Sequence, residues 1–210
     1  MKTRLSILLL ALALAACDQP QRPTVPLYLA MQRGDIEQIE RHLKWGSDFE
    51  RLDPDGYAPL HVAVRKGRTA IVRLLLRHGV TVDRPDRDGH TALWHAVMRG
   101  HTIIADLLLK AGAKIDPDAW LLDAAHNDVQ TRETVRYLVA HGANLEIRDQ
   151  QGDTPLLIAI RRGNHKLVRH LLDAGADATV KDARGRSALT IAKGTGLQDI
   201  VGLLKRYGAT

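Results

Sequence analysis

The chain has 210 residues, with 30 Lys or Arg, 24 Asp or Glu and a formal net charge of +6. This length suffices for one compact domain or one extended array, and the single Cys excludes an intramolecular disulfide framework and any multi-thiolate zinc or iron–sulfur site. The eight aromatic residues are few for a nucleic-acid binder that stacks bases, so the cationic excess needs another explanation.

The N-terminus has the pattern of a secretion signal. Two cations, Lys2 and Arg4, precede a run from Leu5 to Ala16 in which only Ser6 is polar. As a helix, this run would cover about 18 Å, which is too short for a hydrocarbon core of about 30 Å. The pattern therefore predicts that residues 1–16 are a signal peptide rather than a membrane span.

The end of this segment, Leu14-Ala15-Ala16-Cys17, resembles the lipobox of bacterial lipoproteins. The resemblance implies that the signal is cleaved before Cys17 and that acyl chains such as palmitate are attached to this residue, which anchors the protein to the cell envelope, facing the periplasm. Asp18 resembles the signal for retention in the inner membrane, and an outer-membrane anchor stays open. The alternative is an ordinary signal peptide in which the cysteine is incidental.

Residues 17–25 are expected to form a tether between the lipid and the rest of the chain. Pro20, Pro23 and Pro26 stand at every third position. This spacing favours an extended, unpaired backbone, so the segment is predicted to be semi-rigid.

Glycine recurs through the rest of the chain at a nearly constant period. One set is Gly46, Gly79, Gly112, Gly142, Gly175 and Gly208, with gaps of 33, 33, 30, 33 and 33 residues. A second set, Gly34, Gly67, Gly100, Gly163 and Gly196, precedes its partners by twelve residues each time. This periodicity predicts a repeat array.

Short motifs follow a third set of glycines in the same register. They are Ala58-Pro59-Leu60-His61, Thr91-Ala92-Leu93-Trp94, Thr154-Pro155-Leu156-Leu157 and Ser187-Ala188-Leu189-Thr190. They resemble the Thr-Pro-Leu-His signature of ankyrin repeats, and Gly142-Ala143-Asn144-Leu145 resembles a further segment of that family. The resemblance covers residues 26–210 and implies an all-α ankyrin-repeat solenoid of about six helix-turn-helix units with β-turn fingers.

The units implied by this register are 26–52, 53–85, 86–118, 119–148, 149–181 and 182–210. The fourth is irregular, because aligning Leu121 with Leu93 implies about five residues lost from the preceding turn and about two gained between His126 and Arg132. We therefore expect a missing or shortened finger within residues 113–132.

Residues 53–85 show how one unit is expected to fold. Asp53 and Gly56 supply turn chemistry, Pro59 opens a first helix, and Gly79 ends a second helix. Neither helix is stable alone. Each pair must therefore bury its apolar side against the neighbouring units.

No motif for catalysis or for a cofactor stands out. The turns Asp53-Pro54-Asp55-Gly56 and Asp86-Arg87-Asp88-Gly89 lack the downstream Glu of a calcium loop. Lys193-Gly194-Thr195 lacks the upstream glycines of a P-loop. We expect no enzyme activity and no cofactor.

The ten histidines do not show a metal-ligand spacing. His90 and His95 are five residues apart, as are His165 and His170, and no HExxH or His-x3-His pair occurs. His61 stands at the signature position, where the resemblance implies hydrogen bonds between turns and neighbouring repeats. No metal site is expected.

The resemblance places the partner on the concave face, which is formed by the finger tips and by two variable positions before the glycine that ends each first helix. These positions are Gln32-Arg33, Arg65-Lys66, Met98-Arg99, Arg161-Arg162 and Gly194-Thr195. Six of the ten are cationic and none is acidic. With the turn tips, the candidate partner-binding residues are Arg33, Arg65, Lys66, Arg99, Arg161, Arg162, Arg87, Arg184 and Arg186.

An acidic protein surface fits this basic concave surface, because Arg binds carboxylates through two donors. Three alternatives stay open. In the first, the cations bind no partner, because the dipoles of the helix C-termini favour them there and water solvates them. In the other two, the partner is a surface of anionic phospholipid headgroups or, least fitting, nucleic acid. No small-molecule substrate is expected.

The sequence thus favours a non-catalytic protein-binding scaffold tethered to the bacterial envelope. A narrower hypothesis is an immunity or inhibitor protein that neutralises a secreted toxin or an envelope enzyme. A different class is an enzyme accessory, with its chemistry in the irregular fourth unit near Asp123, His126 and Asp128. A purely structural envelope element is a third possibility.

Overall fold

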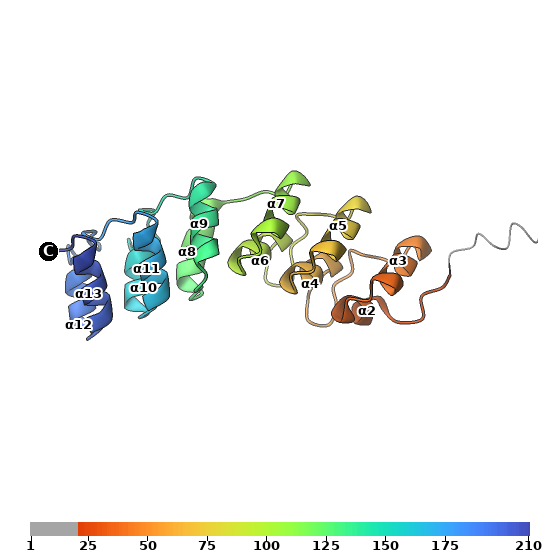
Figure 1. The fold of residues 1–210 in the computed structure, drawn as a ribbon, viewed down its shortest axis with the longest axis horizontal. Helices are drawn as coiled ribbons and strands as arrows, with labels where there is room; N and C mark the ends of the chain where they lie inside the picture. The colour runs from red at the N-terminus through yellow and green to blue at the C-terminus, as the bar shows by residue number, and fades with distance from the viewer. Residues whose placement is uncertain (1–20) are drawn as a thin grey trace, which may run out of the picture.

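The computed structural model describes residues 21–210, so the predicted signal peptide, Cys17 and Asp18 lie outside the described residues. Within the described part, the chain forms helix pairs that stack side by side into one elongated array, without strands (Figure 1). The helices are α2 Leu27–Arg33, α3 Ile36–Trp45, α4 Pro59–Arg65, α5 Thr69–Arg77, α6 Ala92–Met98, α7 Thr102–Lys110, α8 Pro117–His126, α9 Arg132–Ala140, α10 Pro155–Arg161, α11 His165–Asp173, α12 Ala188–Gly194 and α13 Gln198–Arg206. The solenoid predicted from the glycine period is confirmed.

The short first helices begin and end where the sequence indicates. In the fifth unit, the Thr154 hydroxyl accepts a hydrogen bond from the backbone N–H of Leu157, and Pro155 occupies the first turn of α10. The Thr154 hydroxyl satisfies one unpaired N–H of the helix start. Proline suits the first turn because it has no N–H that would be left unpaired there. The chain then reverses at Gly163, whose φ of +67° suits glycine.

The core lies between the two helices of each unit and between neighbouring units. The core repeats from unit to unit. Each second helix from the second unit onward has a fully buried leucine at the same position: Leu75, Leu108, Leu138, Leu171 and Leu204. In the first unit, the corresponding position holds His42, which is buried and hydrogen-bonds through both ring nitrogens, to Ser47 Oγ and to the Val25 carbonyl, each at 2.7 Å. A polar residue at this position fits a unit that has no further helix pair before it among residues 21–210.

The N-terminal edge of the array includes part of the segment predicted as a tether. The backbone N–H of Thr24 donates to Gln38 Oε1 at 3.0 Å, and Val25 bonds to His42. The folded domain therefore begins at or before Thr24, and the stretch left to act as a spacer is shorter than residues 17–25.

Turns with one shared geometry form the fingers. An aspartate at the base of each accepts, through Oδ1, the backbone N–H groups two and four residues later, at 2.8–3.0 Å. These aspartates are Asp53, Asp86, Asp149 and Asp182. A single isolated bridge, Lys181 to Ser187, spans the last finger among the described residues.

The fourth unit lacks such a finger, as the sequence predicts. Only residues 111–116 separate α7 from α8, and Asp116 caps α8 directly by accepting the N–H of Ala119 at 3.1 Å. At this boundary α6 packs mainly against α9, whereas elsewhere first helices pack on first helices. In Figure 1, α8–α13 stand upright while α2–α7 are seen more obliquely, so the array twists along its length.

No helix among residues 21–210 has the length and apolar character needed to cross a bilayer.

Candidate partner-binding surface

The two variable positions at the end of each first helix differ in what their side chains do. The second position holds Lys66, Arg99 and Arg162, each the C-terminal capping residue of its helix, followed by a left-handed glycine. All three are exposed, and none makes an ion pair or side-chain hydrogen bond within residues 21–210. We call these three residues the cation row.

Two further predicted residues are similarly unpaired. Arg33 ends α2, and Arg184 lies at the tip of the last finger. Both side chains are exposed and lack an ion pair with any described residue. In the fourth unit the equivalent capping residue is the uncharged Asn127, so the row is interrupted there.

The first variable position is engaged within the chain. Arg65 is half-buried, and its guanidinium lies 3.7 Å from the centre of the Tyr57 ring, a cation–π contact. Arg161 donates to both carboxylate oxygens of Asp153, at 2.6 and 3.1 Å, and to Asp182 Oδ2 at 2.8 Å. Arg65 thus joins a finger to a helix of its own unit, whereas Arg161 joins two neighbouring units.

Two of the predicted finger arginines are also engaged. Arg87 donates to the Pro54 carbonyl at 2.8 Å and so links the second and third fingers. Arg186 donates to Asp182 Oδ2 through Nε at 2.9 Å. The nine predicted residues therefore comprise five unpaired cations and four with structural contacts.

The paired arginines change the ionisation of Asp182. Burial of this carboxyl opposes its ionisation, but hydrogen bonds from the Arg186 backbone and from the Arg161 and Arg186 guanidinium groups outweigh it, so the pKa of Asp182 lies well below its ordinary value. The same contacts with Asp153 and Asp182 raise the pKa of Arg161. The cluster is a fixed ion-pair network.

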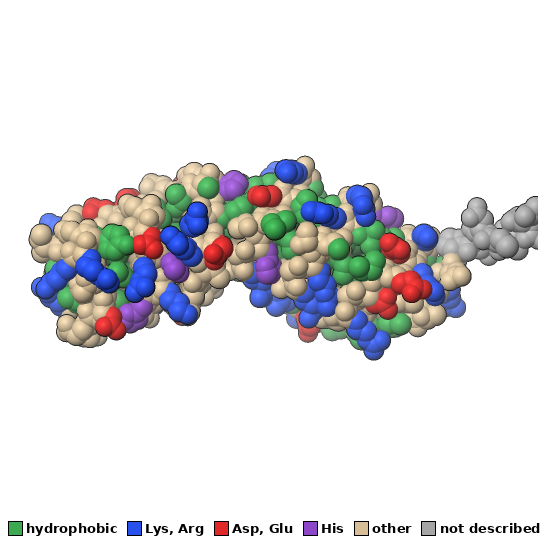
Figure 2. Space-filling model, in the orientation of Figure 1, with side chains coloured by type: hydrophobic (Ala, Val, Ile, Leu, Met, Phe, Trp, Pro, Cys, Tyr) green, Lys and Arg blue, Asp and Glu red, His purple; other side chains and the backbone are tan. Residues whose placement is uncertain are grey.

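Lysines and arginines do not form one continuous patch on the face shown in Figure 2. They are spread along its length, with acidic and apolar side chains between them. A partner that uses them would make separate contacts with several units.

The irregular fourth unit does not gather its acid–base residues on one another. Asp123 Oδ2 accepts the Trp94 indole N–H at 3.1 Å, His126 Nε2 lies 3.3 Å from Asp149 Oδ2, and Asp128 Oδ1 accepts from the Asn164 amide at 2.6 Å. Each of these three side chains thus contacts a residue of a neighbouring unit. The contacts give all three side chains a structural role in joining the units.

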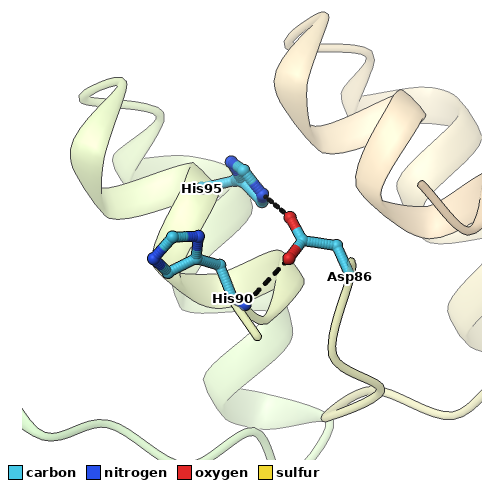
Figure 3. Close-up of side chains that lie close together, drawn as sticks. All are labelled: Asp86, His90 and His95. Carbon is cyan, nitrogen blue, oxygen red and sulfur yellow. Dashed lines mark hydrogen bonds and ion pairs between the residues drawn. The ribbon is translucent and has the colours of Figure 1, made fainter. Parts of the chain in front are cut away.

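A histidine cluster that the sequence did not indicate lies in the third unit (Figure 3). Asp86, His90 and His95 bring their ligand atoms within 4.8 Å of one another, and His95 Nε2 lies 2.7 Å from Asp86 Oδ2. Burial lowers the pKa of His95 to about 4, against the opposing effect of Asp86, so the ring is neutral at neutral pH.

His61 lies beside this cluster, with its ring edge-on to that of His95 at a centroid distance of 5.9 Å. Burial lowers its pKa, with Asp86 and the backbone of His90 and Arg84 opposing the effect. Neither ring nitrogen reaches hydrogen-bond geometry with a described residue. The hydrogen bonds expected for this signature histidine are therefore not formed with any residue among 21–210.

An open groove of about 880 Å³ lies at the N-terminal end of the array. No finger precedes α2 within residues 21–26, and the aromatic rings of Tyr28, Trp45 and Tyr57 line this groove together with Met31. Trp45 is 51% exposed. The sequence did not single out these side chains, because they are far apart along the chain.

Comparison with known proteins identifies the repeat. A family model described as ankyrin repeats in three copies matches residues 27–119 and again residues 121–210. The chain belongs to the ankyrin-repeat family. Ankyrin-repeat domains are generally non-catalytic scaffolds that bind proteins, and this ankyrin chain has the corresponding architecture.

Solved ankyrin structures resemble this ankyrin chain over most of its length. The ankyrin repeat domain of Bcl-3, of the IkappaB family, is 29% identical with a TM-score of 0.68, covering 90% of this chain and 89% of that one. An ankyrin repeat domain from Acinetobacter baumannii AYE is 29% identical with a TM-score of 0.63, covering 88% and 98%. A comparison with curated protein sequences finds no match.

A third similar structure is a complex. A chain in the assembly of the predatory endopeptidase Bd0816 from Bdellovibrio bacteriovorus with the immunity protein Bd3460 is 28% identical, with a TM-score of 0.64. The match covers 84% of this ankyrin chain and 95% of that one.

Proposed function

We propose that this ankyrin chain is a non-catalytic scaffold of the bacterial envelope that binds an acidic protein surface through its cation row. The observation that carries the proposal is the contrast at the ends of the first helices. At the first variable position, Arg65 and Arg161 contact other side chains of the protein. At the second variable position, Lys66, Arg99 and Arg162 are exposed and make no ion pair among residues 21–210. Unpaired cations at repeated positions suit recognition of carboxylates.

The location in the envelope is part of the same proposal and rests on the N-terminal sequence. The lipobox-like Leu14-Ala15-Ala16-Cys17 supports attachment of lipid to Cys17, and Asp18 favours the inner membrane. Acyl chains contribute about 0.8 kcal/mol per buried methylene, so several chains would hold the array at the membrane. The array would then face the periplasm.

A second candidate function is that of an immunity protein. The complex of Bd3460 with the endopeptidase Bd0816 supports it, because that complex contains a chain similar to this one over most of both lengths. The acidic partner would then be an envelope hydrolase or a toxin, held inactive by the array.

In-cell crosslinking of the tagged, acylated full chain tests the binding surface. The triple variant Lys66→Glu, Arg99→Glu, Arg162→Glu should lose capture of the partner found with the wild type. The matched control Arg73→Glu, Lys110→Glu, Arg169→Glu places the same charge change on exposed residues of the second helices and should retain capture. Circular dichroism of both variants should match the wild type. Equal recovery of the partner with both variants would contradict a role for the cation row.

The identity of the captured partner separates the two candidates. An immunity protein predicts a hydrolase or toxin whose activity falls when the purified full chain is added, and cells lacking the gene should become sensitive to it. A general scaffold predicts assembly defects without such sensitivity.

A further inference from the structure

The aspartate of the histidine cluster is explained by the fold, but its histidines are not. Asp86 builds the third finger in the same way as Asp53, Asp149 and Asp182 build theirs. Four residues later, the other fingers have Tyr57, Asp153 and Arg186 where the third has His90. The fold therefore does not require histidine at this position.

The second histidine is still harder to explain by packing. Nine residues after the finger aspartate, the other units have Val62, Ile158 and Ile191, all buried and apolar, where the third has His95. His95 is only 6% exposed. Placing an imidazole where an aliphatic side chain fits costs desolvation free energy, which a polar function at this position would account for.

The donor atoms lie close to the geometry of a metal site (Figure 3). His95 Nε2 and Asp86 Oδ2 are 2.7 Å apart, and all three ligand atoms fall within 4.8 Å of one another. Zinc bonds of about 2.0 Å at tetrahedral angles place ligand atoms about 3.3 Å apart. Small side-chain rotations, mainly of the half-buried His90, would bring the set to that spacing.

The surrounding contacts fix Asp86 and keep His90 close to it. Asp86 Oδ1 accepts the backbone N–H groups of Asp88 and His90, which leaves Oδ2 for the ring of His95. The His90 ring stacks on Trp94 at a centroid distance of 3.7 Å, and the Trp94 indole is fixed by its hydrogen bond to Asp123. Such outer contacts orient the ligands of metal sites.

We propose that Asp86, His90 and His95 bind one divalent transition-metal ion of the zinc class. Two imidazoles and one carboxylate are a donor set that suits zinc. The ion would lie between His95 Nε2 and Asp86 Oδ2, where the hydrogen bond now lies, and the neutral imidazole would carry its proton on Nδ1 instead. The exposed side of His90 leaves a coordination position for water or for a side chain of a partner.

Titration of the untagged full chain with Zn²⁺, followed by calorimetry, tests the site. The wild type should bind one ion per chain, and its melting temperature should rise with zinc. His90→Ala should weaken binding at least about tenfold, and His95→Ile should abolish it. His95→Ile introduces the residue type that other units have at this position, so this variant is expected to fold.

The control and the contrary outcomes are defined by the same titration. His165→Ala removes an exposed histidine of another unit and should leave zinc affinity unchanged. The proposal is overturned if the wild type binds no zinc at a free Zn²⁺ concentration of about 100 μM. It is equally overturned if His90→Ala and His95→Ile bind as tightly as the wild type, since the cluster would then be only a hydrogen bond between a finger and a helix.

Discussion

Thr134 donates a hydrogen bond of 2.7 Å to the backbone carbonyl of Val97 and thereby joins the third and fourth units. Thr134 is fully buried, and its hydroxyl also accepts from Thr131, since its own proton is used on Val97. This polar contact crosses the boundary between units at which the finger is missing, where α6 meets α9 instead of another first helix.

Replacing Thr134 by Val should therefore lower the free energy of unfolding by about 1 kcal/mol, the usual net value of such a bond. The substitution keeps the shape of the side chain and removes only the hydroxyl. Urea unfolding measures the change. Thr134→Ser keeps the hydroxyl donor and should therefore retain the part of the free energy of unfolding that is due to the hydrogen bond. An unchanged unfolding midpoint for Thr134→Val would show that this bond contributes nothing.

The fingers provide a comparison between two glycines of similar conformation. Gly56 and Gly89 have φ of +88° and +85°, but a Cβ on Gly56 would lie 2.6 Å from Arg87 Cβ, whereas a Cβ on Gly89 would meet nothing within 4 Å. Gly89→Ala should cost about 1–2 kcal/mol from the backbone conformation alone. Gly56→Ala should cost about 1–3 kcal/mol more through the clash. Thermal unfolding of both variants gives the difference, and equal destabilisation would be the contrary result.

Adjacent arginines are expected to have opposite roles. Arg161→Met removes the partner of Asp153 and Asp182 and should lower the free energy of unfolding by about 1–2 kcal/mol, because charged groups lose their hydrogen bonds. Arg162→Met, one residue later, should leave stability within about 0.5 kcal/mol of the wild type. Denaturant unfolding of both purified variants measures these free energies. Similar losses of stability for the two variants would show that Arg161 is no more important to the fold than the unpaired Arg162.

Acid should weaken the last finger. The folded pKa of Asp182 is below its ordinary value of 3.8, so its ionisation stabilises the fold fully above that value, and the contribution is lost as the pH falls through the folded pKa. A carboxyl-carbon NMR titration should place the midpoint of Asp182 below 3.8. Asp182→Asn should reduce the loss of stability between neutral pH and acid, and a midpoint at or above the ordinary value would contradict the ion-pair network.

Lipid attachment is expected to depend on one residue. Cys17→Ser should eliminate metabolic labelling with palmitate, because the chain has no other thiol to acylate. Thr24 and Val25 pack on α3 well beyond the substitution, so the array should still fold. Labelling of the variant at the wild-type level would exclude Cys17 as the attachment site.

Much of the fold could be predicted because it depends on local chemistry that the sequence repeats. Left-handed glycines, first-turn prolines and finger aspartates act within a few residues of themselves, so a constant period places them correctly. The missing finger was also predictable, since aligning Leu121 with Leu93 leaves the preceding turn about five residues short.

The side-chain partners could not be predicted in the same way. Arg161 and Arg162 are both exposed cations before a glycine, and only the arrangement of two successive fingers shows that Asp153 and Asp182 bind the first of them. Similarly, Asp86, His90 and His95 have no ligand spacing along the chain, because a turn and a helix bring them together. One signal was present in the sequence: His95 stands where the other units have Val or Ile.

The boundary between the third and fourth units has a consequence for how the array unfolds. The main contacts between helices join only helices of the same or adjacent units among the described residues. Cooperativity must therefore pass through each boundary in turn. Where the finger is absent, the contacts include single bonds such as those of Thr134 and Trp94, and we expect hydrogen exchange to divide the molecule there into two blocks of three units that open separately.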